Sequence, residues 1–154
     1  MKILRIQLKN LNSLRGRHDI DLEGDPLGTA GIFAIVGPTG GGKSTILDAM
    51  TLALYGRAAR YGNQANPETM MTRHTGDCSA EVEFLVPSGR HRAVWQLRRA
   101  GNKSSGNLQP ARRYLYGPGG EVIAQQIREV ETRVQDLSGL DYDRFMRSVL
   151  LAQG

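Results

Sequence analysis

Nine consecutive residues in the first third of the chain have the spacing of a phosphate-binding loop. The first eight fit the pattern G-x-x-x-x-G-K-[ST] at every fixed position, and the nine residues are Gly37, Pro38, Thr39, Gly40, Gly41, Gly42, Lys43, Ser44 and Thr45. Glycines allow positive φ angles and let backbone N–H groups approach a phosphate closely. The lysine can bridge the β- and γ-phosphates, and the serine hydroxyl can ligate Mg²⁺. The motif therefore predicts a site for ATP and Mg²⁺.

The residues on either side of this loop fit the strand–loop–helix context that the motif requires. Residues 32–36 form a continuous apolar run, which predicts a strand covered on both faces. Residues 44–55 carry apolar side chains on nearly all sides, which predicts a buried helix whose positive end faces the phosphates. Asp48 does not have the placement of a catalytic base, and we expect it on the helix surface or in a subunit contact.

The rest of the chain predicts short strands followed by two helices. Alternating apolar residues predict an antiparallel strand pair over 2–9 and 18–22, a hairpin over 80–86 and 92–98, and a strand over 112–116. Residues 56–78 are polar and irregular, with one helical turn expected around 68–72. Apolar spacings of three and four predict an amphipathic helix over 127–137 that ends at Gly139, and Asp141 can cap a last short helix.

Composition excludes several classes of protein. The 154 residues suit one domain, and 40% hydrophobic with 23% charged residues is typical of a folded globular protein. A single cysteine, Cys78, excludes an intrachain disulfide or a CxxC zinc site, and we expect it to be a structural thiol. The histidines His18, His74 and His91 lack metal-ligand spacing. With no apolar run of ~18 residues and no signal peptide, we expect a cytoplasmic protein without a membrane partner.

Positive charge is concentrated in the middle of the chain. Residues 57–113 hold ten of the 20 Lys and Arg but only four of the 15 Asp and Glu. The basic residues of the predicted hairpins are Arg90, Arg92, Arg98, Arg99, Lys103, Arg112 and Arg113. They could contact a nucleic-acid backbone, or they could form a solvated face or a surface for a protein partner. Trp95 alternates with apolar residues in one of these strands, so core packing is favoured over base stacking.

Short motifs along the whole chain have the order found in one family of ATPases. They lie at residues 8–14, 33–40, 47–49, 80–84, 106–109, 139–142 and 150–154. Together they closely resemble the SbcC family, the ATPase subunits of bacterial SbcCD nucleases among the SMC-like double-strand-break-repair ATPases. The resemblance implies an α/β fold: a P-loop NTPase, in the form of an ABC-type ATPase N-terminal lobe with an antiparallel β-hairpin subdomain. Residues 1–154 are then expected to be the N-terminal half of the head, ending at the Q-loop before a coiled coil.

The resemblance also implies roles for residues outside the phosphate-binding loop. Gln153 is expected to contact Mg²⁺ and the attacking water, so Lys43 and Gln153 are the expected catalytic residues and Ser44 and Gln153 the expected metal ligands. Four further residues are expected beside the nucleotide, namely Asn12, Ser13, Thr72 and Arg73.

By the same resemblance, ATP binding and hydrolysis in the full-length protein drive dimerisation of the heads and gate processing of double-stranded DNA. The expected partners are an SbcD-type nuclease subunit, a second copy of the protein through the ATPase heads, and double-stranded DNA, at the nucleoid. The 154 residues contain no Walker B strand, signature motif or zinc hook. We therefore expect no ATP turnover from this chain alone.

Three other readings of the phosphate-binding loop stay open. One is another P-loop ATPase of the SMC- or RecF-like DNA-binding class. A small-molecule kinase would need a lid and a substrate pocket. A GTPase would need a base-reading N-K-x-D motif, which the sequence does not contain.

Overall fold

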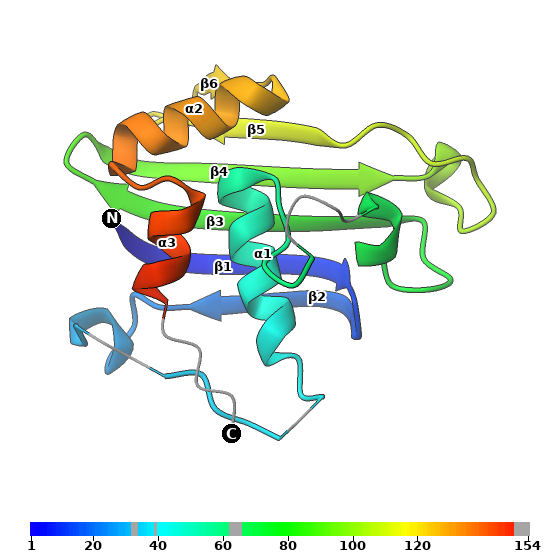
Figure 1. Cartoon of the computed structure of the whole chain (residues 1–154), viewed down its shortest axis with the longest axis horizontal. Helices are drawn as coiled ribbons and strands as arrows, with labels where there is room; N and C mark the ends of the chain where they lie inside the picture. The colour runs from blue at the N-terminus through cyan, green and yellow to red at the C-terminus, as the bar shows by residue number, and fades with distance from the viewer. Residues whose placement is uncertain (32–33, 39, 62–65, 150–154) are drawn as a thin grey trace.

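The chain folds into a six-stranded antiparallel sheet with helices packed on one of its faces (Figure 1). The structure is a computed structural model that describes residues 1–31, 34–38, 40–61 and 66–149. The strands are β1 Lys2–Leu11, β2 Leu14–Asp21, β3 Asp77–Val86, β4 Gly89–Arg98, β5 Arg112–Tyr116 and β6 Val122–Ala124. The helices are α1 Lys43–Tyr55, α2 Ile127–Ser138 and α3 Tyr142–Ser148, with 3₁₀ turns η1 Leu27–Thr29, η2 Pro67–Met70 and η3 Ala100–Asn102.

The sheet order is β2-β1-β3-β4-β5-β6, and every neighbouring pair runs antiparallel. Strand alternation divides the side chains between two environments. On β1, Leu4, Ile6 and Leu8 are buried towards the helices, whereas Arg5 and Gln7 belong to the opposite, half-exposed face. The register continues this division across the sheet, because Leu8 pairs with Ala80 and Ala80 with Trp95, all three of them buried.

Helix α1 lies across the sheet and is buried along most of its length. Ten of its thirteen residues are buried, as its apolar composition predicts. It ends at Gly56, whose φ of 72° lies in the left-handed region that glycine adopts most readily. Near this end the Tyr55 hydroxyl donates to the Leu140 carbonyl at 2.9 Å, and the Tyr55 ring packs against Phe145 of α3. The C-terminal helices therefore rest on the same helix that begins at the phosphate-binding loop.

Most of the elements expected from the sequence are confirmed. The two strand pairs, the strand at 112–116, the helical turn near 68–72 and both late helices all occur, but β2 begins at Leu14, four residues before the predicted strand over 18–22. Gly139 ends α2, and the Asp141 carboxylate accepts the Arg144 backbone N–H to cap α3. The three-residue strand β6 was not expected, because it is too short to show a period. Along the described segments, no helix is both long and apolar enough to cross a membrane.

The strand predicted over residues 32–36 is wrong for the residues that can be checked. Ala34, Ile35 and Val36 have no strand pairing, and the Val36 residue is 86% exposed. Among the described residues, neither the six strands nor the two isolated bridges, Leu11–Met71 and Arg99–Leu108, include a residue of this run. An apolar run becomes a buried strand only where another strand supplies the backbone partners. Residues 32 and 33 lie outside the described part of the chain.

Candidate functional site

The phosphate-binding loop leads directly into the first turn of α1. Gly42 is the N-cap, with φ 91° and ψ 6°, and no side chain caps the helix there. The Gly41 N–H donates to the Pro38 carbonyl at 3.0 Å, which tightens the loop. A Cβ atom on Gly42 would lie 2.8 Å from Leu14 Cδ2, so the turn between β1 and β2 packs directly against the loop. Thr39 lies outside the described residues.

The side chains of the first turn of α1 divide between solvent and core. Lys43 and Ser44 are exposed, whereas Thr45 is 1% exposed. The Lys43 ammonium donates to the Gly37 carbonyl, which folds the lysine back over the loop. The uncapped first turn presents backbone N–H groups and the positive end of the helix dipole. This arrangement suits an anion placed between the loop and the lysine.

Two of the residues expected beside the nucleotide, Asn12 and Thr72, lie next to this first turn. The Asn12 Nδ2 atom donates to the Thr45 Oγ1 atom at 3.4 Å. The Thr72 hydroxyl donates to the Asn12 carbonyl at 2.8 Å, and the Thr72 N–H donates to the Asn10 carbonyl at 2.9 Å. The end of β1, the segment before β3 and the start of α1 therefore meet at one place.

The other two residues of this set, Ser13 and Arg73, are exposed beside the first two. Ser13 lies in the tight turn between β1 and β2, adjacent to the Leu14 that contacts Gly42. Arg73 follows Thr72 and lines a cavity of about 470 Å³. Gln153 lies outside the described residues, so its expected place beside Mg²⁺ is not tested.

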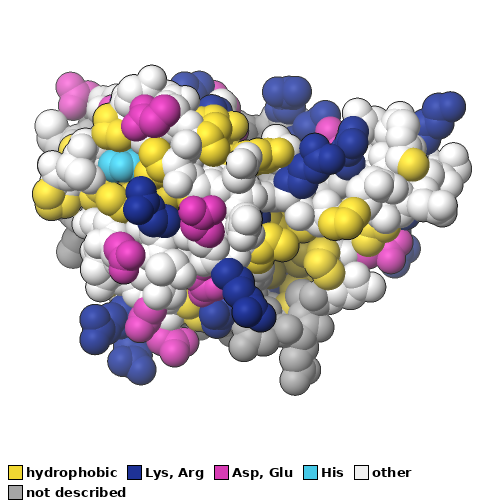
Figure 2. Space-filling view, turned by 90° about the horizontal axis from the view of Figure 1, so that it is seen from above, with side chains coloured by type: hydrophobic (Ala, Val, Ile, Leu, Met, Phe, Trp, Pro, Cys, Tyr) yellow, Lys and Arg dark blue, Asp and Glu magenta, His cyan; other side chains and the backbone are white. Residues whose placement is uncertain are grey.

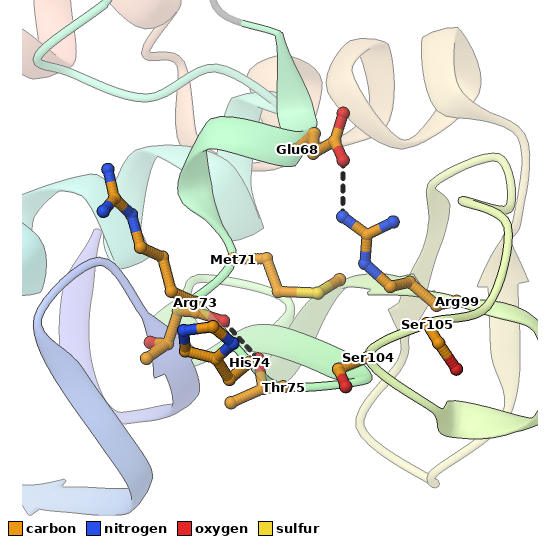
Figure 3. Close-up of a pocket in the computed structure, with 9 residues that line it drawn as sticks. Glu68, Met71, Arg73, His74, Thr75, Arg99, Ser104 and Ser105 are labelled. Atoms are coloured by element: carbon orange, nitrogen blue, oxygen red, sulfur yellow. Dashed lines mark hydrogen bonds and ion pairs between the residues drawn. The ribbon is translucent and has the colours of Figure 1, made fainter.

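The cavity lies between the segment before β3 and the connection between β4 and β5 (Figure 3). Its lining is polar and includes Glu68, Arg73, His74, Arg99 and Ser104. Arg99 forms an ion pair with Glu68 across the cavity, and the Arg73 guanidinium points away from Ser104. The cavity shares Thr72 and Arg73 with the expected nucleotide site, and none of the loop residues that the structure describes lines it.

Asp48 does not lie on the helix surface, and the expectation that it would is wrong. The residue is fully buried, and its Oδ1 atom accepts the Arg60 N–H at 2.9 Å. Its Oδ2 atom accepts a hydrogen bond from Asn12 Nδ2 at 3.2 Å. Burial raises the pKa of Asp48, while the bonds from Arg60 and Asn12 oppose that rise by stabilising the charged form. A lone carboxylate within an apolar helix is the sequence signal that could have revealed this network.

The basic cluster expected from the sequence is not one continuous cationic surface. Arg90 forms ion pairs with Glu23 and Glu83, and Arg92 pairs with Glu81 at 2.7 Å. Arg99 pairs with Glu68. Across the described residues, the exposed members with no carboxylate within 4.0 Å are Arg98, Lys103 and Arg112. Figure 2 shows several Lys and Arg side chains towards the end of the molecule that holds η3.

Arg113, expected in that basic cluster, is instead buried, with 1% exposure. Its guanidinium donates to the Leu54 carbonyl at 3.0 Å and the Ala53 carbonyl at 3.3 Å. It also donates to the Ile127 carbonyl at 2.9 Å, and burial lowers its pKa to about 10. Strand alternation places Arg113 on the helix-covered face of β5, opposite its exposed neighbour Arg112.

Two further expectations about single residues are confirmed. Cys78 is 2% exposed, and burial raises the pKa of its thiol to about 12, as suits a structural rather than a reactive cysteine. Trp95 is 3% exposed within the core, so it is not available to stack on a base. Within the described ranges, no group of three or more His, Cys, Asp or Glu side chains could hold a metal ion.

A comparison with protein families matches residues 5–154 to the family described as AAA domain. Among curated proteins, the SbcC subunit of the SbcCD nuclease of Pseudomonas aeruginosa is 39% identical over 99% of this chain and 14% of its own length. The SbcC protein of Bacillus subtilis is 36% identical over 100% of the chain and 14% of its own length. A probable DNA double-strand break repair Rad50 ATPase of Aquifex aeolicus is 30% identical over 100% of the chain and 14% of its own length. The chain thus spans about a seventh of the length of these relatives.

Among solved structures, the SMC head domain from Thermotoga maritima matches with a TM-score of 0.55 and 19% sequence identity. The match covers 86% of this chain and 42% of that chain, and it confirms the fold class expected from the motifs. The phosphate-binding loop, the fold and the family match agree, and the chain therefore belongs to the AAA domain family.

Proposed function

We propose that the phosphate-binding loop and the start of α1 bind ATP with Mg²⁺. The observation that carries this proposal is the uncapped N-terminus of α1, which follows a glycine at φ 91° and bears the exposed Lys43. Backbone N–H groups of residues 37–45 surround the phosphates, and Lys43 moves from the Gly37 carbonyl to the β- and γ-phosphates. The Ser44 hydroxyl is the protein ligand that this turn offers to Mg²⁺.

Further residues complete the proposed site. Asn12, Ser13, Thr72 and Arg73 lie beside the nucleotide, next to the first turn of α1. Gln153 ligates Mg²⁺ and orients the attacking water, so Gln153→Ala in the full-length protein reduces hydrolysis more than nucleotide affinity.

We further propose that the whole protein is a DNA-repair ATPase of the SbcC kind. This chain is then the N-terminal half of its ATPase head, and other parts of the protein supply the Walker B and signature residues. ATP binding and hydrolysis drive dimerisation of two heads and gate the processing of double-stranded DNA by an SbcD-type nuclease subunit, in the cytoplasm at the nucleoid. Support for this proposal comes from the curated relatives, which are named as nuclease subunits and double-strand break repair ATPases.

Nucleotide binding is tested by titrating the chain with ATP and Mg²⁺ and following backbone NMR shifts. The expected dissociation constant is weaker than micromolar, because contacts from an opposing head are missing and a loss of ~3 kcal/mol weakens binding about a hundredfold. Lys43→Ala removes the shifts at residues 37–45, whereas the control Lys103→Ala, at an exposed lysine outside the site, leaves them unchanged. Unchanged affinity in Lys43→Ala contradicts the proposed site, and equal competition by GTP favours a GTPase.

A further inference from the structure

Asp48 is a fully buried charge beside the proposed nucleotide site, and its contacts extend in two directions. Its position in α1 is one turn beyond Thr45. One carboxylate oxygen accepts the Arg60 N–H, 12 residues further along the chain, and the other accepts the side-chain amide of Asn12, 36 residues earlier. The Arg60 guanidinium lies 3.6 Å from the same carboxylate. A buried carboxylate is costly unless every such bond is made, so these contacts fix its surroundings.

Asn12 is held by residues 70–72 and by α1, and its backbone is in a conformation that few residues adopt. Its φ is 48°, in the left-handed region that asparagine tolerates better than most side chains. Its N–H donates to the Met70 carbonyl at 2.8 Å, and its carbonyl accepts the Thr72 hydroxyl. The side-chain Nδ2 atom then meets Asp48 and Thr45 together. An ionised carboxylate can only accept hydrogen bonds, so it selects the amide orientation with Nδ2 facing inward.

We propose that Asp48 is a positioning residue for nucleotide binding, which acts by locking the side chain of Asn12 beside the first turn of α1. The inference rests on the proposed function, because it assigns a partner to one residue of that site. In this arrangement the Asn12 Oδ1 atom is the amide's remaining polar atom, and it serves as an acceptor for a donor group of the nucleotide. The sources of such a donor are a ribose hydroxyl and the amino group of adenine.

Thr51 provides a matched control for a merely structural role. It is also fully buried in α1, and its hydroxyl accepts the Ala59 N–H at 3.0 Å. Thr51 and Asp48 therefore both hold the segment that follows the helix. Only Asp48 also reaches Asn12. A substitution at Thr51 consequently changes stability through the segment 58–60 without disturbing the amide beside Thr45.

The test compares ATP affinity and thermal stability in Asp48→Asn, Asn12→Ala, the double variant and Thr51→Val, below the melting temperature of each. Losing a hydrogen bond to a charged group weakens ATP binding about tenfold in Asp48→Asn. The same change has no further effect when Asn12 is already alanine, and Thr51→Val lowers the melting temperature without changing affinity. Unchanged affinity in Asp48→Asn, or an equal loss in the Asn12→Ala background, overturns the proposal.

Analogues of ATP identify the donor. If the ribose supplies it, the deoxyribose analogue binds wild type more weakly and binds Asn12→Ala no differently from ATP. If the base supplies it, the analogue that lacks the adenine amino group shows this pattern instead. If the affinity of each analogue relative to ATP is the same in the wild type as in Asn12→Ala, Oδ1 does not act as an acceptor for the nucleotide.

A measurement on the wild-type chain keeps the proposal testable even if Asp48→Asn does not fold. The side-chain amide protons of Asn12 are expected to exchange with solvent at least tenfold more slowly than those of the exposed Asn107. Exchange as fast as at Asn107 overturns the locked orientation. This exchange measurement does not depend on nucleotide binding. If neither the wild-type chain nor Lys43→Ala binds ATP, the proposed function is refuted, and the amide exchange rate still decides whether Asp48 locks Asn12.

Discussion

Gly42 is the residue at which the backbone geometry of the loop and its packing against the sheet coincide. Its φ of 91° already disfavours any side chain, and a Cβ there would meet Leu14 at 2.8 Å. Gly40 offers a matched comparison, because its φ is 81° but a Cβ atom there would meet no other atom within 4 Å. The two glycines therefore separate the cost of a strained backbone from the cost of a steric clash.

We expect Gly40→Ala to destabilise the chain by about 1 kcal/mol, and Gly42→Ala by about 2–3 kcal/mol. The difference arises because alanine at 42 must displace the side chain of Leu14, which in turn moves the turn beside Asn12. Urea denaturation, with the slope held common to all variants, measures both free energies. Equal losses at the two positions show that Leu14 does not constrain the loop.

The chemistry of the candidate site was predictable at the residue scale only where it is local in sequence. Residues 37–45 are recognisable from their types and spacing, because consecutive residues of one loop make all the contacts that phosphate binding needs. The burial of Asp48 was not predictable in this way, since its partners Asn12 and Arg60 come from other segments. The roles of Asn12 and Thr72 are expected only from the family resemblance, although the structure shows that Thr72 bonds to Asn12 and that Asn12 bonds to Thr45.

At the scale of elements, Arg113 joins the end of α1 to the start of α2. It donates to the last carbonyls of α1 at Ala53 and Leu54 and to the carbonyl of Ile127, the first residue of α2. The Ala53 and Leu54 carbonyls lie in the last turn of α1, where the helix supplies no further N–H donors. The buried guanidinium satisfies them from β5, so one side chain connects two helices and a strand.

We expect Arg113→Met to lower the free energy of unfolding by about 3 kcal/mol. Methionine can fill most of the volume, but it leaves the carbonyls of Ala53 and Leu54, at the end of α1, without the donor that Arg113 supplies. Arg112→Met is the matched control, because Arg112 is the exposed neighbour on the same strand, and a change there is expected within about 0.5 kcal/mol. Chemical denaturation measures both, and similar effects at the two positions contradict the structural role of Arg113.

Elements with a clear period were predictable, whereas those that depend on a distant partner were not. The alternation on β1, β3 and β4 and the apolar spacings of α2 each repeat often enough to identify one buried face. The apolar run at 32–36 shows why such a pattern is insufficient by itself. Its residues 34–36 are exposed and have no neighbouring strand to pair with. Hydrophobicity alone predicts burial, but a buried strand also needs a neighbouring strand.

At the scale of the whole molecule, the helices cover one face of the sheet and leave charged side chains on the other. Acidic and basic residues alternate across that second face, as in the pairs Arg5–Asp19 and Arg92–Glu81. Three exposed cations with no carboxylate within 4.0 Å among the described residues, Arg98, Lys103 and Arg112, lie together at the end of the sheet that carries the connection between β4 and β5.

We expect these three cations, rather than the paired arginines nearby, to contact a DNA backbone. Replacing Arg98, Lys103 and Arg112 together by glutamine weakens binding of the chain to double-stranded DNA. Each lost phosphate contact also reduces the slope of log K against log salt by about 0.9, so three contacts reduce it by about 2.7. Fluorescence anisotropy with a labelled duplex, over a series of salt concentrations, measures affinity and slope together.

The matched control replaces Arg90, Arg92 and Arg99 by glutamine, which removes the same three charges. Those side chains are held by Glu23, Glu81, Glu83 and Glu68, so they are not free to displace counterions from phosphates. Their loss changes the overall charge and therefore the affinity, but it leaves the salt slope close to that of the wild type. If both triple variants lower the slope equally, DNA responds to net charge alone, and the end of the sheet is not a defined contact surface.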